Sequence, residues 1–379
     1  MTRRSWAVVV PLLATALAVV LGVLSPARAA APGAPVNTVP PSISGTPQVG
    51  VVLTADPGTW SPEADLYRYT WLRDGVAVGP EVWSTPTYRL VAADQGHRIS
   101  VQVRAHNTSG DSDPVVSPET TVVAPGRFTV STRPGVAGVR RWDRTLTARP
   151  GTWSPAPALI RYQWFRDTTP IKGAVRTTYR LRVADFGHRI NLRVTGFRTG
   201  YVTGVAWSGA TGRIDHRVGV RKRFTYSITT RGRITANLAT FAQQAAQTFA
   251  DPRGWRSAGY QFTRVARGGD FTLVLSEASR LPSFGPPCSS MWSCRSGRFV
   301  IINQTRWLHA SPAWNAAHLP LRDYRHMVVD HETGHWLGHR HSSCPGKGRP
   351  APVMMQQSKG LNGCRFNPFP LPSERWTSR

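Results

Sequence analysis

Apolar and polar residues alternate along two stretches of the N-terminal half, Ile99–Val103 and Ile190–Val194. Successive side chains of a β-strand point to opposite faces, so this period of two predicts strands with one buried face. Tyr69 and Trp71 alternate in the same way before an Asp-Gly pair, which predicts a strand that enters a turn. Short strands between Gly- and Pro-rich turns are typical of all-β sandwiches with two sheets.

The same half of the chain contains an internal duplication. GTWSPEADLYRYTWLRDG from Gly58 matches GTWSPAPALIRYQWFRD from Gly151, and TYRLVAADQGHRISVQV from Thr87 matches TYRLRVADFGHRINLRV from Thr178. A repeat of about 90 residues is a domain-sized unit. The two copies, roughly residues 38–214, resemble the immunoglobulin-like repeats of bacterial surface and secreted proteins. We therefore expect two immunoglobulin-like domains at 36–125 and 126–216.

Two histidines, His97 and His188, occupy equivalent positions in the repeats, each after a glycine. They are candidates for a ligand site, but a turn position copied by the duplication explains them equally simply. We favour the structural interpretation. Since neither repeat contains a catalytic constellation, the repeats are expected to space or attach the C-terminal region.

The pattern changes after about residue 222. Alternation at Phe224–Ile228 predicts a strand, and the apolar spacing of Ala236–Phe249 predicts a helix that ends before Asp251-Pro252. Further strands are predicted from Tyr260, Phe271 and Arg298, and a second helix from about Leu321 to Trp336. Residues 222–379 are thus expected to form an α+β domain.

The stretch HETGHWLGHRH begins at His331, near the end of the second predicted helix. Residues four apart lie one above the other on a helix, so His331 and His335 should direct both imidazoles to one point. Glu332 is close enough to reach a water molecule bound there. This is the H-E-x-x-H arrangement of zinc peptidases. Imidazole suits Zn²⁺, and a catalytic zinc has three protein ligands and one open position.

The third ligand is expected beyond a break in the helix. Gly338 can adopt a left-handed conformation and end the helix. The full pattern H-E-x-x-H-x-x-G-x-x-H is the metzincin signature, with His341 as the third ligand. His339 follows the glycine directly and is expected to point elsewhere, in a supporting or surface role. Metzincins also have a methionine turn below the metal, and PVMMQQ supplies Met354 and Met355 downstream.

The longer segment YRHMVVDHETGHWLGHRHSSCPGKGRPAPVMMQQSKGLNGCRFNPFP resembles a family of uncharacterised, secreted, metzincin-like domains of high-GC Gram-positive bacteria. The resemblance covers about residues 222–372 and includes DPRGW at Asp251. It implies a zinc ion on His331, His335 and His341, Glu332 as the base and Met354 under the metal. Asp330 stands where that family more often has asparagine, and Met355 where it more often has glutamine.

The chain has four cysteines, Cys288, Cys294, Cys344 and Cys364. An even number in an exported protein suggests disulfides, and four cysteines allow three pairings. The local pairing, Cys288–Cys294 with Cys344–Cys364, closes the shortest loops and is the one predicted.

The N-terminus has the layout of a secretory signal peptide, residues 1–29. Arg3 and Arg4 precede an uncharged run, and small residues ending at Ala29 offer a cleavage site. An uncleaved anchor helix is the alternative. No later run is apolar for long enough to span a membrane, so a secreted or wall-associated protein is expected.

The formal charge is +27, and it falls to +24 without residues 1–29, which carry three arginines and no acid. Such a chain should attract polyanions. Its export and its lack of a nucleic-acid motif argue against nucleic acid, and anionic cell-wall polymers are the more natural partner. A soluble surface rich in arginine is the simpler alternative.

The leading hypothesis is a secreted zinc endopeptidase that acts on a protein or peptide. Gln356 and Gln357 are possible substrate contacts. The alternatives are a hydrolase of cell-wall peptide or amide bonds, and a non-catalytic binding protein whose zinc is structural.

Overall fold

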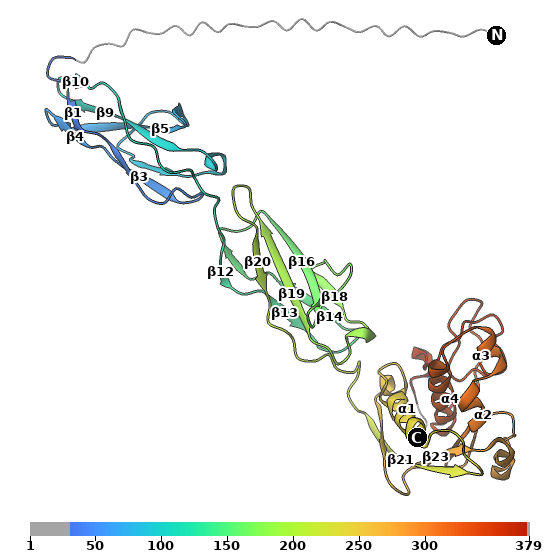
Figure 1. Ribbon diagram of the computed structural model, residues 1–379. Helices are drawn as coiled ribbons and strands as arrows, with labels where there is room; N and C mark the ends of the chain where they lie inside the picture. The colour runs from blue at the N-terminus through green and yellow to red at the C-terminus, as the bar shows by residue number, and fades with distance from the viewer. Residues whose placement is uncertain (1–30, 377–379) are drawn as a thin grey trace, which may run out of the picture. The chain divides into compact units, whose positions relative to one another are not determined.

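The computed structural model describes residues 31–376 (Figure 1). The predicted signal peptide lies outside the described residues. Contacts between Cα atoms divide the chain into two units. The first ends at Arg127 and includes Thr199–Val202, and the second contains Phe128–Arg198 and the chain from Thr203 onward. Within residues 31–376, no helix is both long enough and apolar enough to cross a membrane.

The first repeat is built from strands alone, apart from one short 3-10 turn. In chain order the strands are β1 (Val36–Val39), β2 (Ser42–Ser44), β3 (Val52–Asp56), β4 (Thr59–Ser61), β5 (Leu66–Arg73), β6 (Val76–Ala77), β7 (Val82–Trp83), β8 (Thr87–Arg89), β9 (Ile99–Asn107), β10 (Gly110–Asp111) and β11 (Val115–Val116). One sheet has the order β2-β3-β8, a second is centred on the antiparallel pair β5-β9, and β1 pairs with β4 in a separate two-stranded sheet.

The second repeat has the same plan. Its strands are β12 (Thr129–Thr132), β13 (Gly135–Gly138), β14 (Thr145–Arg149), β15 (Thr152–Ser154), β16 (Leu159–Arg166), β17 (Thr169–Pro170), β18 (Thr178–Arg180), β19 (Ile190–Phe197) and β20 (Gly204–Trp207). The sheets run β13-β14-β18 and β17-β16-β19-β20. The predicted all-β sandwich is therefore present in both copies.

The alternating residues form the core of each sandwich, as the sequence pattern predicts. Ile99, Val101 and Val103 of β9 are fully buried, and they pack in one cluster with Leu53 of β3 in the opposite sheet. The repeated tryptophans are also buried, so these cores are filled by aromatic side chains without a bridging disulfide.

A buried aspartate explains much of the repeated motif. Asp94 is fully buried and accepts hydrogen bonds from Arg73 Nη2 at 2.6 Å, from Tyr88 Oη at 3.0 Å and from the Val91 N–H at 2.7 Å. Burial first, and then the bond to Asp94, raises the pKa of Tyr88 to about 12. A buried carboxylate must be paired to be tolerated, so the motif preserves a structural network.

The second copy repeats that network around Asp185, which pairs with Arg166 and with Tyr179 Oη at 2.8 Å. The repeated histidines also have equivalent surroundings. His188 Nδ1 lies 2.6 Å from Asp167, and His97 contacts Asp74 in the same way at 2.5 Å. Each pair lies exposed at a turn, which agrees with the structural interpretation of the two histidines.

The C-terminal region combines a mixed sheet with helices (Figure 1). Its elements are β21 (Lys222–Arg231), α1 (Leu238–Ala250), β22 (Tyr260–Arg264), β23 (Phe271–Ser276), β24 (Cys294–Ser296), β25 (Phe299–Asn303), α2 (Gln304–His309), α3 (Pro312–Ala316) and α4 (Leu321–Trp336). The sheet order is β22-β21-β23-β25-β24. All neighbours are parallel except β24, which runs antiparallel to β25 at one edge.

RFVIINQTRW, residues 298–307, is predicted to form one strand, but the strand β25 ends at Asn303. The Asn303 side chain accepts a hydrogen bond from the Thr305 N–H and so caps α2. An asparagine at this position favours a helix start over strand continuation. The helices α1 and α4 pack with the sheet in one core, in which Phe241, Phe271 and Val329 are fully buried.

Candidate metal centre

The last two turns of α4 carry His331, Glu332 and His335. The helix ends as predicted, because Gly338 has a φ of 101°. A residue in the left-handed conformation at this point reverses the chain. Glycine adopts this conformation readily because it has no Cβ. The chain then returns toward the helix and brings His341 to the two helical histidines.

The three histidines predicted as ligands lie together. One ring nitrogen from each of His331, His335 and His341 falls within 4.8 Å of the others. His335 Nε2 and His341 Nε2 are 3.1 Å apart. Two nitrogens on a tetrahedral zinc, with Zn–N bonds of about 2.0–2.1 Å, are separated by roughly 3.3 Å. The cluster therefore suits a small cation.

Backbone carbonyls orient both helical imidazoles. His331 Nδ1 donates to the Val353 carbonyl at 2.7 Å, and His335 Nδ1 donates to the His339 carbonyl at 2.9 Å. Since a carbonyl only accepts, each Nδ1 carries the proton and each Nε2 has a free lone pair. Such a bond on the remote nitrogen is usual for metal-binding histidines.

The pKa values of these histidines favour the neutral form that binds a metal. Burial lowers the pKa of His331 to about 3 and that of His335 to about 4. Burial also lowers the pKa of His341. Among the described residues the cluster contains three imidazoles and no fourth donor, which matches the donor set of a catalytic zinc site.

His339 does not join this cluster. Its ring stacks on Trp255 at 4.8 Å between centroids, and its Nε2 lies 2.6 Å from the Trp376 carbonyl. The carbonyl of the same residue holds His335. The supporting role expected for His339 therefore has two parts. Its backbone carbonyl positions His335, and its side chain packs against Trp255.

Glu332 lies beside the histidines at the wall of a cavity of about 710 Å³, which also reaches Trp292 and Ser358. The residue is 5% exposed, and burial raises its pKa to about 8. A carboxyl group in such surroundings can exchange a proton near neutral pH.

Met354 lies directly beneath the helix that carries the ligands. A Cβ added to Gly334 would collide with the Met354 sulfur and would come within 2.8 Å of Trp255 Cζ2. This close approach explains why glycine occupies the position between Glu332 and His335. Met354 is fully buried.

A carboxylate that sequence reasoning missed holds the methionine turn. Glu374 accepts hydrogen bonds from the N–H groups of Met354 at 2.9 Å, Val353 at 3.0 Å and Leu371 at 2.7 Å. The Val353 carbonyl in turn accepts from His331. Pro372 followed by Glu374 is a helix-start signal, but nothing in that signal indicates its partner in the turn.

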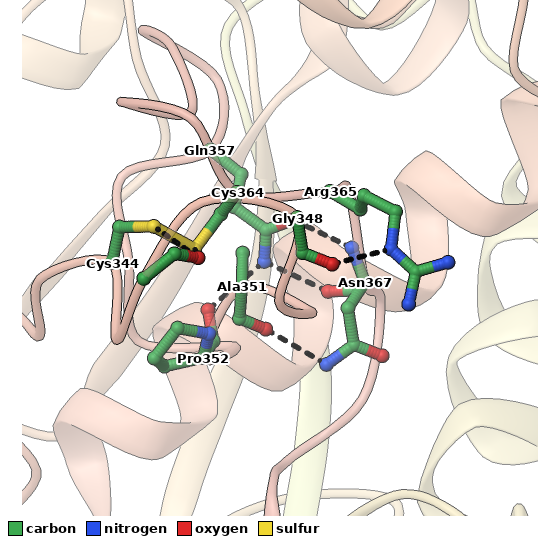
Figure 2. Close-up of a disulfide and its surroundings, with 9 residues drawn as sticks. Cys344, Gly348, Ala351, Pro352, Gln357, Cys364, Arg365 and Asn367 are labelled. Atoms are coloured by element: carbon green, nitrogen blue, oxygen red, sulfur yellow. Dashed lines mark hydrogen bonds between the residues drawn. A yellow bond between two sulfur atoms is a disulfide. The ribbon is translucent and has the colours of Figure 1, made fainter.

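Both predicted disulfides are formed, Cys288–Cys294 and Cys344–Cys364. Figure 2 shows the second one close to Ala351, Pro352 and Gln357, which lie on either side of Met354 in the sequence. Gln357 is buried and donates to the Pro352 and Asn367 carbonyls at 3.0 and 2.8 Å. Its amide is therefore used within the loop, which argues against the expected substrate contact.

The two departures from the family pattern are both buried. Met355 packs with Ala351 and Cys364. Asp330 is fully buried, and neither of its carboxyl oxygens has a hydrogen-bond partner among the described residues. Burial raises the pKa of Asp330 well above its ordinary range.

Most of this region is similar to a known sequence family. A family described as a protein of unknown function, DUF3152, matches residues 201–372. No curated protein is significantly similar to the chain.

The similar solved structures include two that consist of tandem all-β domains. A segment of two fibronectin type III domains from chicken tenascin is 14% identical, with 44% of this chain and 95% of that chain covered and a TM-score of 0.25. The tandem immunoglobulin repeats of Dlar are 16% identical, with 46% and 96% covered and a TM-score of 0.15. With scores this low, the sandwich fold of the repeats is established by their own strand pairing and shared cores.

Proposed function

We propose that the C-terminal region is a secreted, metzincin-like zinc endopeptidase. The observation that carries the proposal is the convergence of three neutral imidazoles, two of them oriented by backbone carbonyls, beside a buried carboxyl group in an open cavity. His331, His335 and His341 would hold the ion. When bound, zinc supplies a Lewis acid that polarises the scissile carbonyl and acidifies water.

Glu332 supplies the proton transfers. Its carboxylate takes a proton from the attacking water as the water oxygen bonds to the carbonyl carbon. The same proton then goes to the leaving nitrogen as the C–N bond breaks. A group with a pKa near neutrality can perform both transfers, and its position next to His331 in the cavity wall gives it access to substrate.

A structural zinc is less well supported. Structural sites usually have four protein ligands, often cysteines. Here all four cysteines are in disulfides, and the cluster found among the described residues contains three histidines. The remaining side of the cluster faces the cavity, where a substrate and water can enter.

Replacement of the base tests the proposal. Glu332→Gln should keep one equivalent of zinc and lose about 10²- to 10⁴-fold in kcat on a peptide substrate. His335→Ala should lose both zinc and activity. Hydrolysis by Glu332→Gln at the wild-type rate would rule out this mechanism. Casein and purified peptidoglycan, assayed in parallel, separate an endopeptidase from a cell-wall hydrolase.

The repeats are proposed to attach the enzyme to anionic cell-wall polymers. Residues 31–216 contain 21 lysines and arginines and 13 acidic residues, a formal charge of +8, and a cationic protein accumulates at a polyanionic surface. A 31–216 fragment should bind purified cell wall at low salt and be released as salt is raised. No retention at low salt would contradict attachment and leave spacing as the role.

A further inference from the structure

The cavity beside the histidines carries an unbalanced positive charge. Arg295, Arg340 and Lys359 line it, whereas Glu332 is the one acidic side chain among its described lining residues. Even with Glu332 ionised, the three cations outnumber it. Within residues 31–376, none of the three cations has a carboxylate at ion-pair distance. Their charge is therefore available to a ligand.

Two of these cations flank the histidines from different segments. Arg295, on the edge strand β24, lines the cavity together with His335. Lys359, which follows the methionine turn, lines the same cavity from another segment. A substrate that reaches the three histidines through this cavity therefore meets positive charge from two separate segments.

Arg295 is the better placed of the two for specific binding. It is half-buried, and its Nε is buried without a hydrogen-bond partner among the described residues. It directly follows Cys294, so the Cys288–Cys294 disulfide restrains its backbone. A guanidinium with free donors matches the two oxygens of a carboxylate. Lys359 is exposed and acts as a more diffuse point charge.

We propose that the cavity selects peptides with a carboxylate next to the scissile bond, and that Arg295 is the residue that determines this specificity, assisted by Lys359. The inference rests on the proposed hydrolase function and adds the substrate class to it. The carboxylate can belong to an acidic side chain or to the free C-terminus of the peptide, since both present the same two oxygens.

Matched fluorogenic peptides test the inference on the full, zinc-loaded chain. One pair differs by Glu or Gln beside the scissile bond, and a second pair by a free or amidated C-terminus. A charge-assisted hydrogen bond predicts a kcat/KM at least about tenfold higher for the acidic member of one pair. Whichever pair shows the preference identifies the source of the carboxylate. Equal rates for both members of both pairs would overturn the inference and leave the hydrolase proposal intact.

Variants assign the preference to Arg295. Arg295→Met should reduce the acidic-to-neutral ratio toward one, Arg295→Lys should restore part of it, and Lys359→Gln should lower it less. Arg267→Met removes an exposed arginine that does not line the cavity and should keep the wild-type ratio. Equal losses on acidic and neutral peptides in Arg295→Met would indicate a structural role and overturn the assignment.

A binding measurement separates the two proposals. Fluorescence anisotropy with the Glu332→Gln variant reports affinity without turnover. The acidic peptide could bind more tightly than the neutral one, and through Arg295, although the wild type hydrolyses neither. That result would support the inference and refute the hydrolase proposal. Poly(glycerol phosphate) is tested as a competitor of the peptide. If it binds through Arg295 more tightly than the acidic peptide does, the choice of a carboxylate ligand is overturned.

Discussion

The carboxylate of Glu374 accepts a hydrogen bond from the backbone N–H of Met354 at 2.9 Å. Glu374 also accepts a hydrogen bond from the Val353 N–H, and the two bonds fix the methionine turn. The Val353 carbonyl in turn orients His331. Glu374 thus acts on His331, a proposed metal ligand, through one short stretch of backbone.

Glu374→Gln should weaken metal binding without touching a ligand. A glutamine amide has one acceptor oxygen, so it cannot satisfy all three N–H groups that the carboxylate now binds. We expect zinc affinity to fall about 10- to 100-fold and unfolding free energy by about 1–3 kcal/mol. Chelator competition and urea denaturation measure these changes. Glu119→Gln, at an exposed position of the first repeat, is the control, and equal effects in both variants would contradict the proposed link.

Gly334→Ala should destabilise the protein although alanine is the better helix former by about 1 kcal/mol. The new Cβ would collide with the Met354 sulfur, and overpacking of this kind costs about 1–3 kcal/mol. The melting temperature of Gly334→Ala should therefore fall, whereas Gln243→Ala on the exposed face of α1 should not lower it. If the collision is the cause, Met354→Ala in the same chain should recover part of the loss, and additive losses would refute it.

His341→Ala and His339→Ala should differ in zinc content. His341 contributes a ring nitrogen to the cluster, whereas His339 contributes a backbone carbonyl that alanine retains. We expect His341→Ala to lose zinc and His339→Ala to keep most of it but to melt at a lower temperature, since its stacking on Trp255 is lost. Elemental analysis after dialysis decides this, and the reverse result would show that the third ligand is misassigned.

Acid should destabilise the protein in part through His326. Burial lowers its pKa from 6.5 to about 4, with a smaller effect from Arg322, against the opposing charge of Asp251. Below pH 6.5 the unfolded chain binds a proton that the folded chain excludes, so stability falls as pH drops from about 6.5 to 4. The loss from this residue is at most about 3 kcal/mol.

His326→Asn removes this titration and keeps a donor for Thr248 Oγ1, which lies 3.0 Å from His326 Nδ1. The fall in unfolding free energy between pH 7 and pH 5 should be smaller in this variant than in the wild type. His309→Asn, at an exposed position of α2, provides the comparison. An unchanged pH dependence in His326→Asn would show that other groups account for the acid sensitivity.

Local spacing in the sequence determined much of the fold and of the ligand cluster. A period of two placed Ile99 and Val101 in a sandwich core, and a spacing of four placed His331 and His335 on one helix face. Gly338 marked the helix end. These features depend on the conformations of a few neighbouring residues, which is why the sequence alone predicts them.

Only the tertiary structure decided what surrounds the cluster. Glu374 reaches Met354, and Arg295 joins Lys359 at one cavity, because packing brings distant segments together. No periodicity relates such residues, since their contacts follow from the assembled sheet, helices and disulfide-bonded loops. The sequence thus predicted the helix end from Gly338. It did not predict the hydrogen bonds that support His331 or the positive charge at the cavity.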